Sequence, residues 1–312
     1  MTPSATDASN EDPAATPAVS VVVIGYSPVE RLVSCLSALD AQRSELGGMA
    51  EVIAVGRWEA RVDVGPSVQL RFPGITWVSA PPDYNVARMR GLGIARSHGS
   101  TVALLEDDCV PGPGWLRRLA DAPPDGAVGG AIEPGDLRRA VDWAAYFCEY
   151  GAYMAPLPRT PRQLPGTNVA YRRAVLPDAH RLETEGLYET FIHQHLRQAG
   201  LPVRADSGLV VRHERSWGAQ AILATRYHHG RGYAGLRLAS RPWWARLPYL
   251  ALALVLPAVL TGRVAGEILR RRRVLGRAVR ALPWVVALSL SWSLGELVGY
   301  AAGPGGSLAR WR

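Results

Sequence analysis

The sequence predicts an α/β fold built on a doubly wound, mostly parallel sheet. Four short apolar runs rich in β-branched residues are typical of strands buried on both faces: residues 19–24, 51–55, 75–78 and 101–105. After the first run, apolar side chains recur at helical spacing from Leu32 to Leu39, and residues 85–98 also predict a helix. Strands that alternate with helices imply a parallel sheet. Ligands bind such sheets at the carboxyl ends of the strands, so the residues that follow each strand are the first candidates for a site.

The length of 312 residues allows one α/β domain of about 200–250 residues with an appendage. Residues 1–18 are rich in Ala, Thr, Pro and Asp and lack the basic and apolar regions of a signal peptide, which predicts a disordered leader. The α/β domain is therefore expected over residues 19–240, in the cytoplasm. Residues 241–312 form a basic and apolar tail.

The net charge of +8 is concentrated in this tail. All 35 basic residues are Arg, and eleven of them lie at or after residue 241 beside only two acidic residues, Glu267 and Glu296. Basic residues next to apolar runs favour an anionic membrane surface. Because basic residues are not interleaved with aromatics as in nucleic-acid modules, we expect no nucleic-acid partner.

The tail contains two apolar runs separated by an Arg-rich segment. Residues 247–262 include two prolines and are short for a membrane span, whereas residues 281–303 are longer and carry Glu296 as their only charge. Seven Arg lie in the segment 263–280 between them. A spanning hairpin would place these Arg outside, against the positive-inside tendency, so a basic helix on the cytoplasmic leaflet fits better. A core hairpin of a soluble protein is the alternative. The tail thus predicts anchoring at the cytoplasmic face of the cell membrane, with its topology open.

Three consecutive acidic residues, Glu106, Asp107 and Asp108, follow the apolar run 101–105. Carboxylates held this close repel one another unless a positive group neutralises them. A hard divalent cation that bridges carboxylate and phosphate oxygens is one such group. A solvated acidic turn or a helix cap is the alternative that the triplet alone leaves open.

Other segments, in order along the chain, distinguish these readings. They are the runs 19–24 and 51–55, then residues 87–95 (Ala-Arg-Met-Arg-Gly-Leu-Gly-Ile-Ala), 104–111 (Leu-Leu-Glu-Asp-Asp-Cys-Val-Pro), 128–130 (Val-Gly-Gly), 166–173 (Gly-Thr-Asn-Val-Ala-Tyr-Arg-Arg), 196–200 (Leu-Arg-Gln-Ala-Gly) and 211–213 (Val-Arg-His). This set resembles the family 2 glycosyltransferases, which have the GT-A fold. The resemblance covers about residues 19–235.

The resemblance implies roles on the donor side of a site. Asp108 matches the last acid of the family's DxD-type motif and would bind Mg²⁺ or Mn²⁺ on the diphosphate of a nucleotide-sugar donor. Glu106 and Asp107 would face the ribose and the surroundings of the metal. Arg90 would lie near the nucleotide.

Further roles concern the sugar and the diphosphate. The resemblance places Gly166, Thr167 and Asn168 along the sugar or acceptor side. His213 ends a strand at the ligand edge and is a candidate for the metal or diphosphate, or else a core or capping histidine. Arg226 is expected to serve the diphosphate or an acidic head group.

A general base is expected at the start of the helix before Gly200. Many members of the family carry Glu-Asp there, and counting back from Gly200 aligns Tyr188 and Glu189 with that pair. Glu189 is therefore the candidate base, with Glu185 as the second choice, because a carboxylate can remove the proton of an acceptor hydroxyl. An ordinary acidic residue in a first helical turn is the alternative. Three apolar residues of this helix are expected to face the sheet: Phe191, Ile192 and Leu196.

Two departures from the family affect specificity. Gly56 and Arg57 follow the second strand, where many members carry an Asp that holds the base, so the nucleotide is not predicted. Arg226 and Tyr227 resemble part of the QxxRW motif of processive members, but Leu223 stands in place of the Gln. We therefore expect transfer of single sugars and not polymer synthesis.

The predicted function is metal-dependent, inverting transfer of a sugar from a nucleotide donor to a hydroxyl of a lipid-linked or cell-envelope acceptor. A sugar-1-phosphate nucleotidyltransferase is one alternative, but residues 25–30 lack the Gly-rich, Arg-containing loop that it needs after the first strand. A non-catalytic sugar-nucleotide-binding or scaffold protein with a degenerate domain is another, since Tyr188 and Glu189 replace the usual Glu-Asp.

Overall fold

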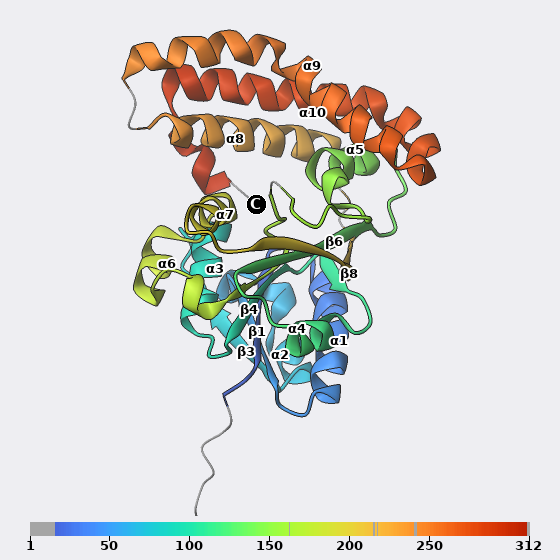
Figure 1. Cartoon of the computed structure of the whole chain (residues 1–312), viewed down its shortest axis with the longest axis vertical. Helices are drawn as coiled ribbons and strands as arrows, with labels where there is room; N and C mark the ends of the chain where they lie inside the picture. Colours follow the sequence, from blue (N-terminus) through green and yellow to red (C-terminus); the bar gives the residue numbers. More distant parts are fainter. Residues whose placement is uncertain (1–15, 162, 215, 217, 240–241, 311–312) are drawn as a thin grey trace, which may run out of the picture.

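The computed structural model describes residues 16–310 except residues 162, 215, 217, 240 and 241. The expected leader therefore lies almost wholly outside the described residues. The chain forms one curled sheet with helices on both faces and a layer of long helices stacked over one end of the sheet domain (Figure 1).

A single eight-stranded sheet has the order β3-β2-β1-β4-β7-β6-β8-β5. Its strands are β1 (Val19–Gly25), β2 (Ala50–Gly56), β3 (Ile75–Ser79), β4 (Thr101–Glu106), β5 (Cys109–Pro111), β6 (Ala127–Pro134), β7 (Asn168–Arg172) and β8 (Val203–His213). The pairs β3-β2, β2-β1, β1-β4 and β6-β8 are parallel, while β4-β7, β7-β6 and β8-β5 are antiparallel. The α/β fold is confirmed, and the sheet is mixed because β5 and β7 run against their neighbours.

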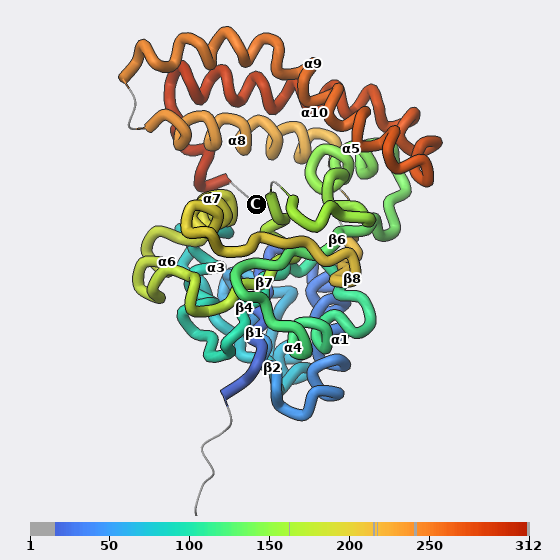
Figure 2. Tube along the Cα trace, viewed as in Figure 1, coloured from blue at the N-terminus to red at the C-terminus, as the bar shows by residue number. Residues whose placement is uncertain are grey.

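Ten α-helices occur in the described chain (Figure 2). They are α1 (Val29–Glu45), α2 (Pro66–Arg71), α3 (Val86–Ala95), α4 (Trp115–Asp121), α5 (Ala140–Glu149), α6 (Ala179–Glu185), α7 (Glu189–Gln198), α8 (Ala219–Arg237), α9 (Leu247–Arg270) and α10 (Leu275–Ala302). Alternate side chains of β1 enter separate cores. Val21 and Val23 pack with α1 and α4, whereas Val22 and Ile24 pack with α3 and α7. The β-branched run thus serves both faces of the sheet, as its composition predicted.

Helices α8, α10 and α9 form the outer layer. The backbones of α8 and α10 approach so closely that a Cβ atom added to Gly295 would lie 2.1 Å from the carbonyl oxygen of Tyr227. On the facing helix, a Cβ on Gly230 would lie 2.2 Å from the carbonyl oxygen of Trp292. Small residues permit this kind of backbone contact between helices. Since α8 precedes residue 240 and packs on α10, the expected domain division there stays a prediction.

The Arg-rich turn between α9 and α10 is attached to the sheet domain. Nε of Arg271 donates to the carbonyl oxygen of Met154 at 3.0 Å. Nη2 of Arg273 bonds the Glu133 carboxylate at 2.7 Å and the carbonyl oxygen of Ala155 at 3.2 Å. The sequence alone assigned this basic segment to a membrane surface, but two of its Arg have partners within the protein.

Two helical segments, Trp243–Arg270 and Arg272–Ala302, are long and apolar enough to cross a membrane. They differ in burial: Ala281, Val285 and Leu288 of α10 are fully buried in the same core as α5, whereas α9 exposes most of its apolar side chains, including Leu254 at 73%. α9 is thus the less buried of the two, although α10 also exposes apolar side chains such as Val279 and Leu294.

Helix α7 packs on the sheet through a histidine. Phe191 is 58% exposed, so its expected inward position was wrong, and the buried side chains are His193 and Leu196. Nε2 of His193 lies 2.9 Å from the Tyr171 hydroxyl, and Nδ1 lies 3.3 Å from Oε1 of Gln163. Burial lowers the pKa of His193 to about 4. This neutral histidine fixes the helix whose first residue is Glu189.

The glycine contact between α8 and α10 predicts a specific loss of stability. Gly295→Ala should lower the free energy of unfolding by roughly 1–3 kcal/mol, because its methyl group would overlap the backbone of α8. Thermal unfolding of the full chain in a neutral detergent measures this loss. Gly276→Ala is the matched control, since a Cβ there meets no heavy atom within 4 Å and alanine favours helix. Equal melting temperatures for the two variants would contradict the contact.

Burial of His193 predicts acid sensitivity. Its pKa of about 4 in the fold lies below about 6.5 in the unfolded chain, so the unfolded state binds more protons between these values and stability falls as pH drops through them. The contribution is about 2 kcal/mol by pH 5. His193→Gln keeps hydrogen-bonding groups but cannot titrate. The stability gap between wild type and variant should therefore shrink from pH 7.5 to pH 5 in denaturant unfolding; a gap independent of pH would refute the assignment.

Candidate functional site

The predicted acidic triplet lies at the carboxyl ends of β1 and β4. Asp107 accepts hydrogen bonds from the backbone N–H groups of Tyr26 at 3.0 Å and Ser27 at 2.9 Å. Burial and then repulsion by Asp108 raise the pKa of Asp107 to about 7, although the Ser27 bonds oppose the shift. Asp107 thus joins the two strand ends at the edge where a ligand is expected.

Arg90 brings together two acidic residues that are far apart in the chain. Its Nη2 lies 2.8 Å from Oε1 of Glu106, and its Nη1 lies 2.8 Å from Oε2 of Glu189. Burial by itself lowers the pKa of Arg90, but the attraction of Glu189 and Glu106 outweighs it and keeps that pKa above its ordinary value. The Arg90 side chain is 8% exposed and that of Glu189 is 30% exposed, so Glu189 is the member of this cluster most open to a substrate. We call Arg90, Glu106 and Glu189 the arginine–carboxylate cluster.

Glu185, the second choice for the base, lies elsewhere. Its Oε2 accepts a hydrogen bond from Nε of Arg181 at 2.8 Å, on the exposed surface of α6. Helix α7 begins at Glu189 and directs that residue to the cluster. The geometry therefore brings Glu189, and not Glu185, to the sheet edge.

The segment Gly166–Asn168 divides into two roles. A Cβ atom on Gly166 would lie 2.8 Å from both Nη2 of Arg90 and Cδ of Glu189, so a larger residue there would displace the ends of these two side chains. The hydroxyl of Thr167 lies 3.0 Å from Sγ of Cys109. Gly166 and Thr167 line a cavity of about 220 Å³ together with the arginine–carboxylate cluster.

Asn168 is not among the residues that line this cavity. Its Oδ1 accepts from Nε1 of Trp115 at 3.0 Å, and its Nδ2 donates to the carbonyl oxygens of Ala131 and Leu209 at 2.9 Å each. The side chain is 2% exposed. Asn168 therefore braces α4, β6 and β8 beneath the site.

The two predicted metal ligands lie next to each other. Nε2 of His213 is 3.5 Å from Oδ2 of Asp108, because β5 and β8 pair Cys109 with His213. Both ring nitrogens of His213 are buried and make no hydrogen bond among the described residues. The centre of the His213 ring lies 4.5 Å from the centre of the Tyr150 ring. A buried imidazole beside a carboxylate suits Mn²⁺ or a similar cation. Within the described chain no group of three or more candidate ligands was found, so other ligands would come from substrate and water.

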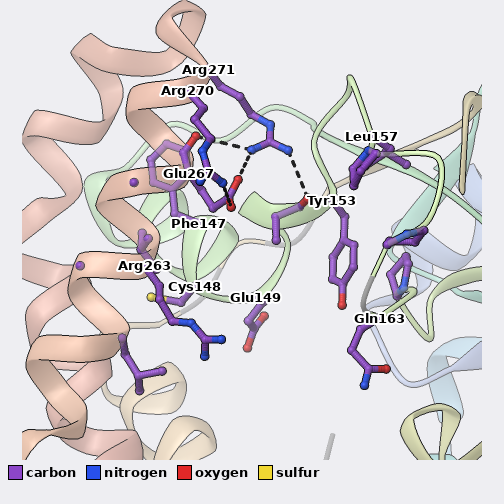
Figure 3. A pocket seen from close by; sticks show the side chains of 18 of the residues that line it. Phe147, Cys148, Glu149, Tyr153, Leu157, Gln163, Arg263, Glu267, Arg270 and Arg271 are labelled. Atoms are coloured by element: carbon purple, nitrogen blue, oxygen red, sulfur yellow. Dashed lines mark hydrogen bonds and ion pairs between the residues drawn. The ribbon is translucent and has the colours of Figure 1, made fainter. Parts of the chain in front are cut away.

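A second, larger cavity of about 1360 Å³ lies beside the first, between residues 147–165 and α9 (Figure 3). Four residues line both cavities: Glu149, Tyr153, Gln163 and Leu164. Arg226 lines the larger one, with Nη1 3.9 Å from Glu149 and its guanidinium 4.4 Å from the ring centre of Trp292. Arg226, expected to serve the diphosphate or an acidic head group, thus lines the larger cavity and not the one with the arginine–carboxylate cluster.

Sequence reasoning missed several residues of the site. The hydroxyl of Tyr26 donates to Oε2 of Glu106. Tyr26 directly follows β1, so the rule that located the acidic triplet also applies to it. Glu149 and Tyr150 at the end of α5, and Gln163 in a loop, have no motif or spacing that marks them. Only the packing of α5 and the 151–165 loop over the sheet edge brings them to the cavities.

Comparisons with known proteins support the fold. Sequence comparison found no matching family model and no matching curated protein. The structure resembles mannosyltransferase PcManGT from Pyrobaculum calidifontis, solved with GDP-Man and Mn²⁺, with a TM-score of 0.57 at 16% identity over 93% of this chain and 89% of that one.

Two other solved structures align less closely. TarS from S. aureus has a TM-score of 0.46 at 11% identity over 88% of this chain and 90% of that one. Glucosyl-3-phosphoglycerate synthase from Mycobacterium tuberculosis has a TM-score of 0.45 at 16% identity over 68% and 76%. The likeness to the mannosyltransferase over nearly the whole of both chains shows that this protein has the GT-A fold of glycosyltransferases.

Proposed function

We propose that this protein transfers a sugar from a nucleotide-sugar donor to a hydroxyl of an acceptor, with inversion and in the manner of the family 2 enzymes. The observation that carries the proposal is the arginine–carboxylate cluster in a cavity at the strand ends of a GT-A fold. Mannosyltransferase PcManGT, which shares the fold, was solved with a nucleotide sugar and Mn²⁺.

Asp108 and His213 would hold a divalent cation, Mg²⁺ or Mn²⁺. Their buried and adjacent oxygen and nitrogen atoms fit such an ion. When bound, the ion would stabilise the negative charge that develops on the departing nucleoside diphosphate. Glu106 and Asp107 remain candidates for the ribose side, and Gly166 and Thr167 for the sugar side.

Glu189 would act as the general base. Its carboxylate lies at the start of α7, 2.8 Å from Nη1 of Arg90, and is the most exposed of the cluster, so an acceptor hydroxyl can reach it. In the proposed reaction Glu189 takes the proton of the acceptor hydroxyl while that oxygen bonds the anomeric carbon. The bond from this carbon to the phosphate oxygen breaks on the opposite face, and the diphosphate leaves with the electron pair.

The α9–α10 hairpin is proposed to lie on the cytoplasmic face of the cell membrane without crossing it. A hairpin that crossed a bilayer would carry its turn about 30 Å away from its two ends. Here the turn bonds Met154 and Glu133 of the sheet domain, while the end of α10 packs on α8. The exposed apolar side chains of α9 are then available to the membrane interface. This position favours a lipid-linked or cell-envelope acceptor.

The metal assignment is tested on binding. Asp108→Asn should weaken Mn²⁺-dependent binding of the donor at least tenfold, because it removes the charged ligand, and His213→Gln should act in the same direction. The measurement is the thermal shift caused by a panel of UDP- and GDP-sugars with Mn²⁺ or EDTA. Asp121→Asn, a change on the exposed surface, is the control. Equal donor affinity of the wild type in Mn²⁺ and in EDTA would exclude the proposed site.

The base assignment is tested on rate. Glu189→Gln should lower the transfer rate by on the order of a hundredfold or more and change donor affinity little, since it keeps the shape of the side chain but cannot accept the proton. Glu185→Gln is the matched control and should be close to wild type. If the two variants exchange these results, Glu185 is the base. If wild type binds donors and neither hydrolyses nor transfers them, the protein is a non-catalytic binder.

A further inference from the structure

The larger cavity has two unlike walls. One wall is the segment from the end of α5 to Leu164, which also borders the small cavity with Glu189. The other wall is α9, which contributes the apolar Val259, Leu260 and Val264 and the charged Arg263, Glu267 and Arg270. The same helix exposes apolar side chains such as Leu252 and Val255 on its outer surface. The cavity therefore connects the arginine–carboxylate cluster with the helix that is proposed to meet the membrane.

Basic side chains outnumber acidic ones in this cavity. Arg270 and Arg271 are both paired with Glu267, and Arg271 also donates to three backbone carbonyls. The remaining basic residues are Arg226 and Arg263, and the remaining acidic residue is Glu149. The lining thus has an excess of positive charge next to the catalytic cavity.

Neither Arg226 nor Arg263 is fully satisfied. Arg226 is 8% exposed, lies 3.9 Å from Glu149, and its buried Nε has no hydrogen-bond partner in the described chain. Arg263 is exposed and has neither an ion pair nor a hydrogen bond among the described residues. Figure 3 shows its guanidinium reaching from α9 toward Glu149. A buried guanidinium without its full set of partners is costly, so an anion that reaches these two residues would bind there.

We propose that this cavity binds the acceptor as a lipid with a phosphate in its head group. The phosphate lies between Arg226 and Arg263, and the hydrocarbon chain follows the apolar side chains Val259, Leu260 and Val264 toward the outer surface of α9. The hydroxyl-bearing sugar reaches the small cavity past Glu149 and Tyr153. This inference rests on the proposed function and names its acceptor class. Arg226 and Arg263 would select a negatively charged head group, and the apolar residues of α9 would select a hydrocarbon chain.

The test uses the full chain in a neutral detergent, with dodecyl phosphate as the probe and dodecanol and inorganic phosphate as competitors. Wild type should bind dodecyl phosphate at least tenfold more tightly than dodecanol, and inorganic phosphate should displace it poorly. Arg263→Gln should weaken dodecyl phosphate binding about tenfold and leave dodecanol binding unchanged, since it removes one charge-assisted bond from an exposed position. Arg226→Gln should act in the same direction.

Arg280→Gln is the matched control, because Arg280 is an exposed residue of the same tail and does not line the cavity. Equal weakening by Arg263→Gln and Arg280→Gln would overturn the site, since only the general charge of the tail would then matter. Equal displacement by inorganic phosphate would overturn the lipid as occupant. Binding of a nucleotide sugar with Mn²⁺ on the same sample separates the two proposals. Loss of that binding with dodecyl phosphate still bound counts against the transferase, whereas the reverse result counts against the lipid site alone.

Discussion

The buried guanidinium of Arg90 is the interaction on which the site depends. It joins α3, the end of β4 and the start of α7, and its two carboxylate partners come from positions sixteen and ninety-nine residues away. Removing a guanidinium from water is costly, and the two carboxylates offset that cost by binding it at 2.8 Å each. Gly166 is part of the same arrangement because a Cβ atom there would crowd the ends of Arg90 and Glu189. A donor that enters this cavity meets charges that are already fixed in place.

The surroundings of the cluster keep it in position without taking part in chemistry. Asp107 ties the end of β4 to the start of the loop after β1 through two backbone N–H groups. Asn168 ties three elements beneath the cavity, and neutral His193 anchors α7 to Tyr171. These buried polar groups are satisfied by partners of fixed geometry, which gives the strand ends little freedom. Beside them, the ring nitrogens of His213 make no such hydrogen bonds with any described residue, so they are available to the proposed cation.

Hydrogen bonds from Arg side chains attach the helical layer to the sheet domain, and close packing holds its helices together. These contacts shape the second cavity. Arg271 and Arg273 fix the turn of the hairpin on Met154, Ala155 and Glu133. Glycines allow α10 to lie directly against α8. α9 is therefore held beside the end of α5 and the loop that follows it, and the space between them is a cavity lined by Glu149 on one side and by Val259 and Arg263 on the other. Under the proposed function, the exposed apolar side chains of α9 and the cavity opening beside Glu149 of α5 would let a membrane-bound substrate reach the site on the sheet domain.

The sequence by itself determined the local features of this protein. Short apolar runs rich in β-branched residues predicted β1 to β4, and apolar residues at helical spacing predicted α1 and α3. The position of the acidic triplet after β4 predicted the edge of the sheet at which a ligand binds. For the tail, the sequence showed only that it is apolar and rich in Arg. The tertiary structure decided which of these features meet. It placed Glu189, and not Glu185, beside Arg90, and it placed Arg226 in a separate cavity. It also buried Asn168 beneath the site and buried His193, and not Phe191, in the core. The reason is physical: periodicity reports which face of an element is buried, whereas the partner of a charged side chain is set by the order of strands and the docking of helices, which depend on contacts between distant segments.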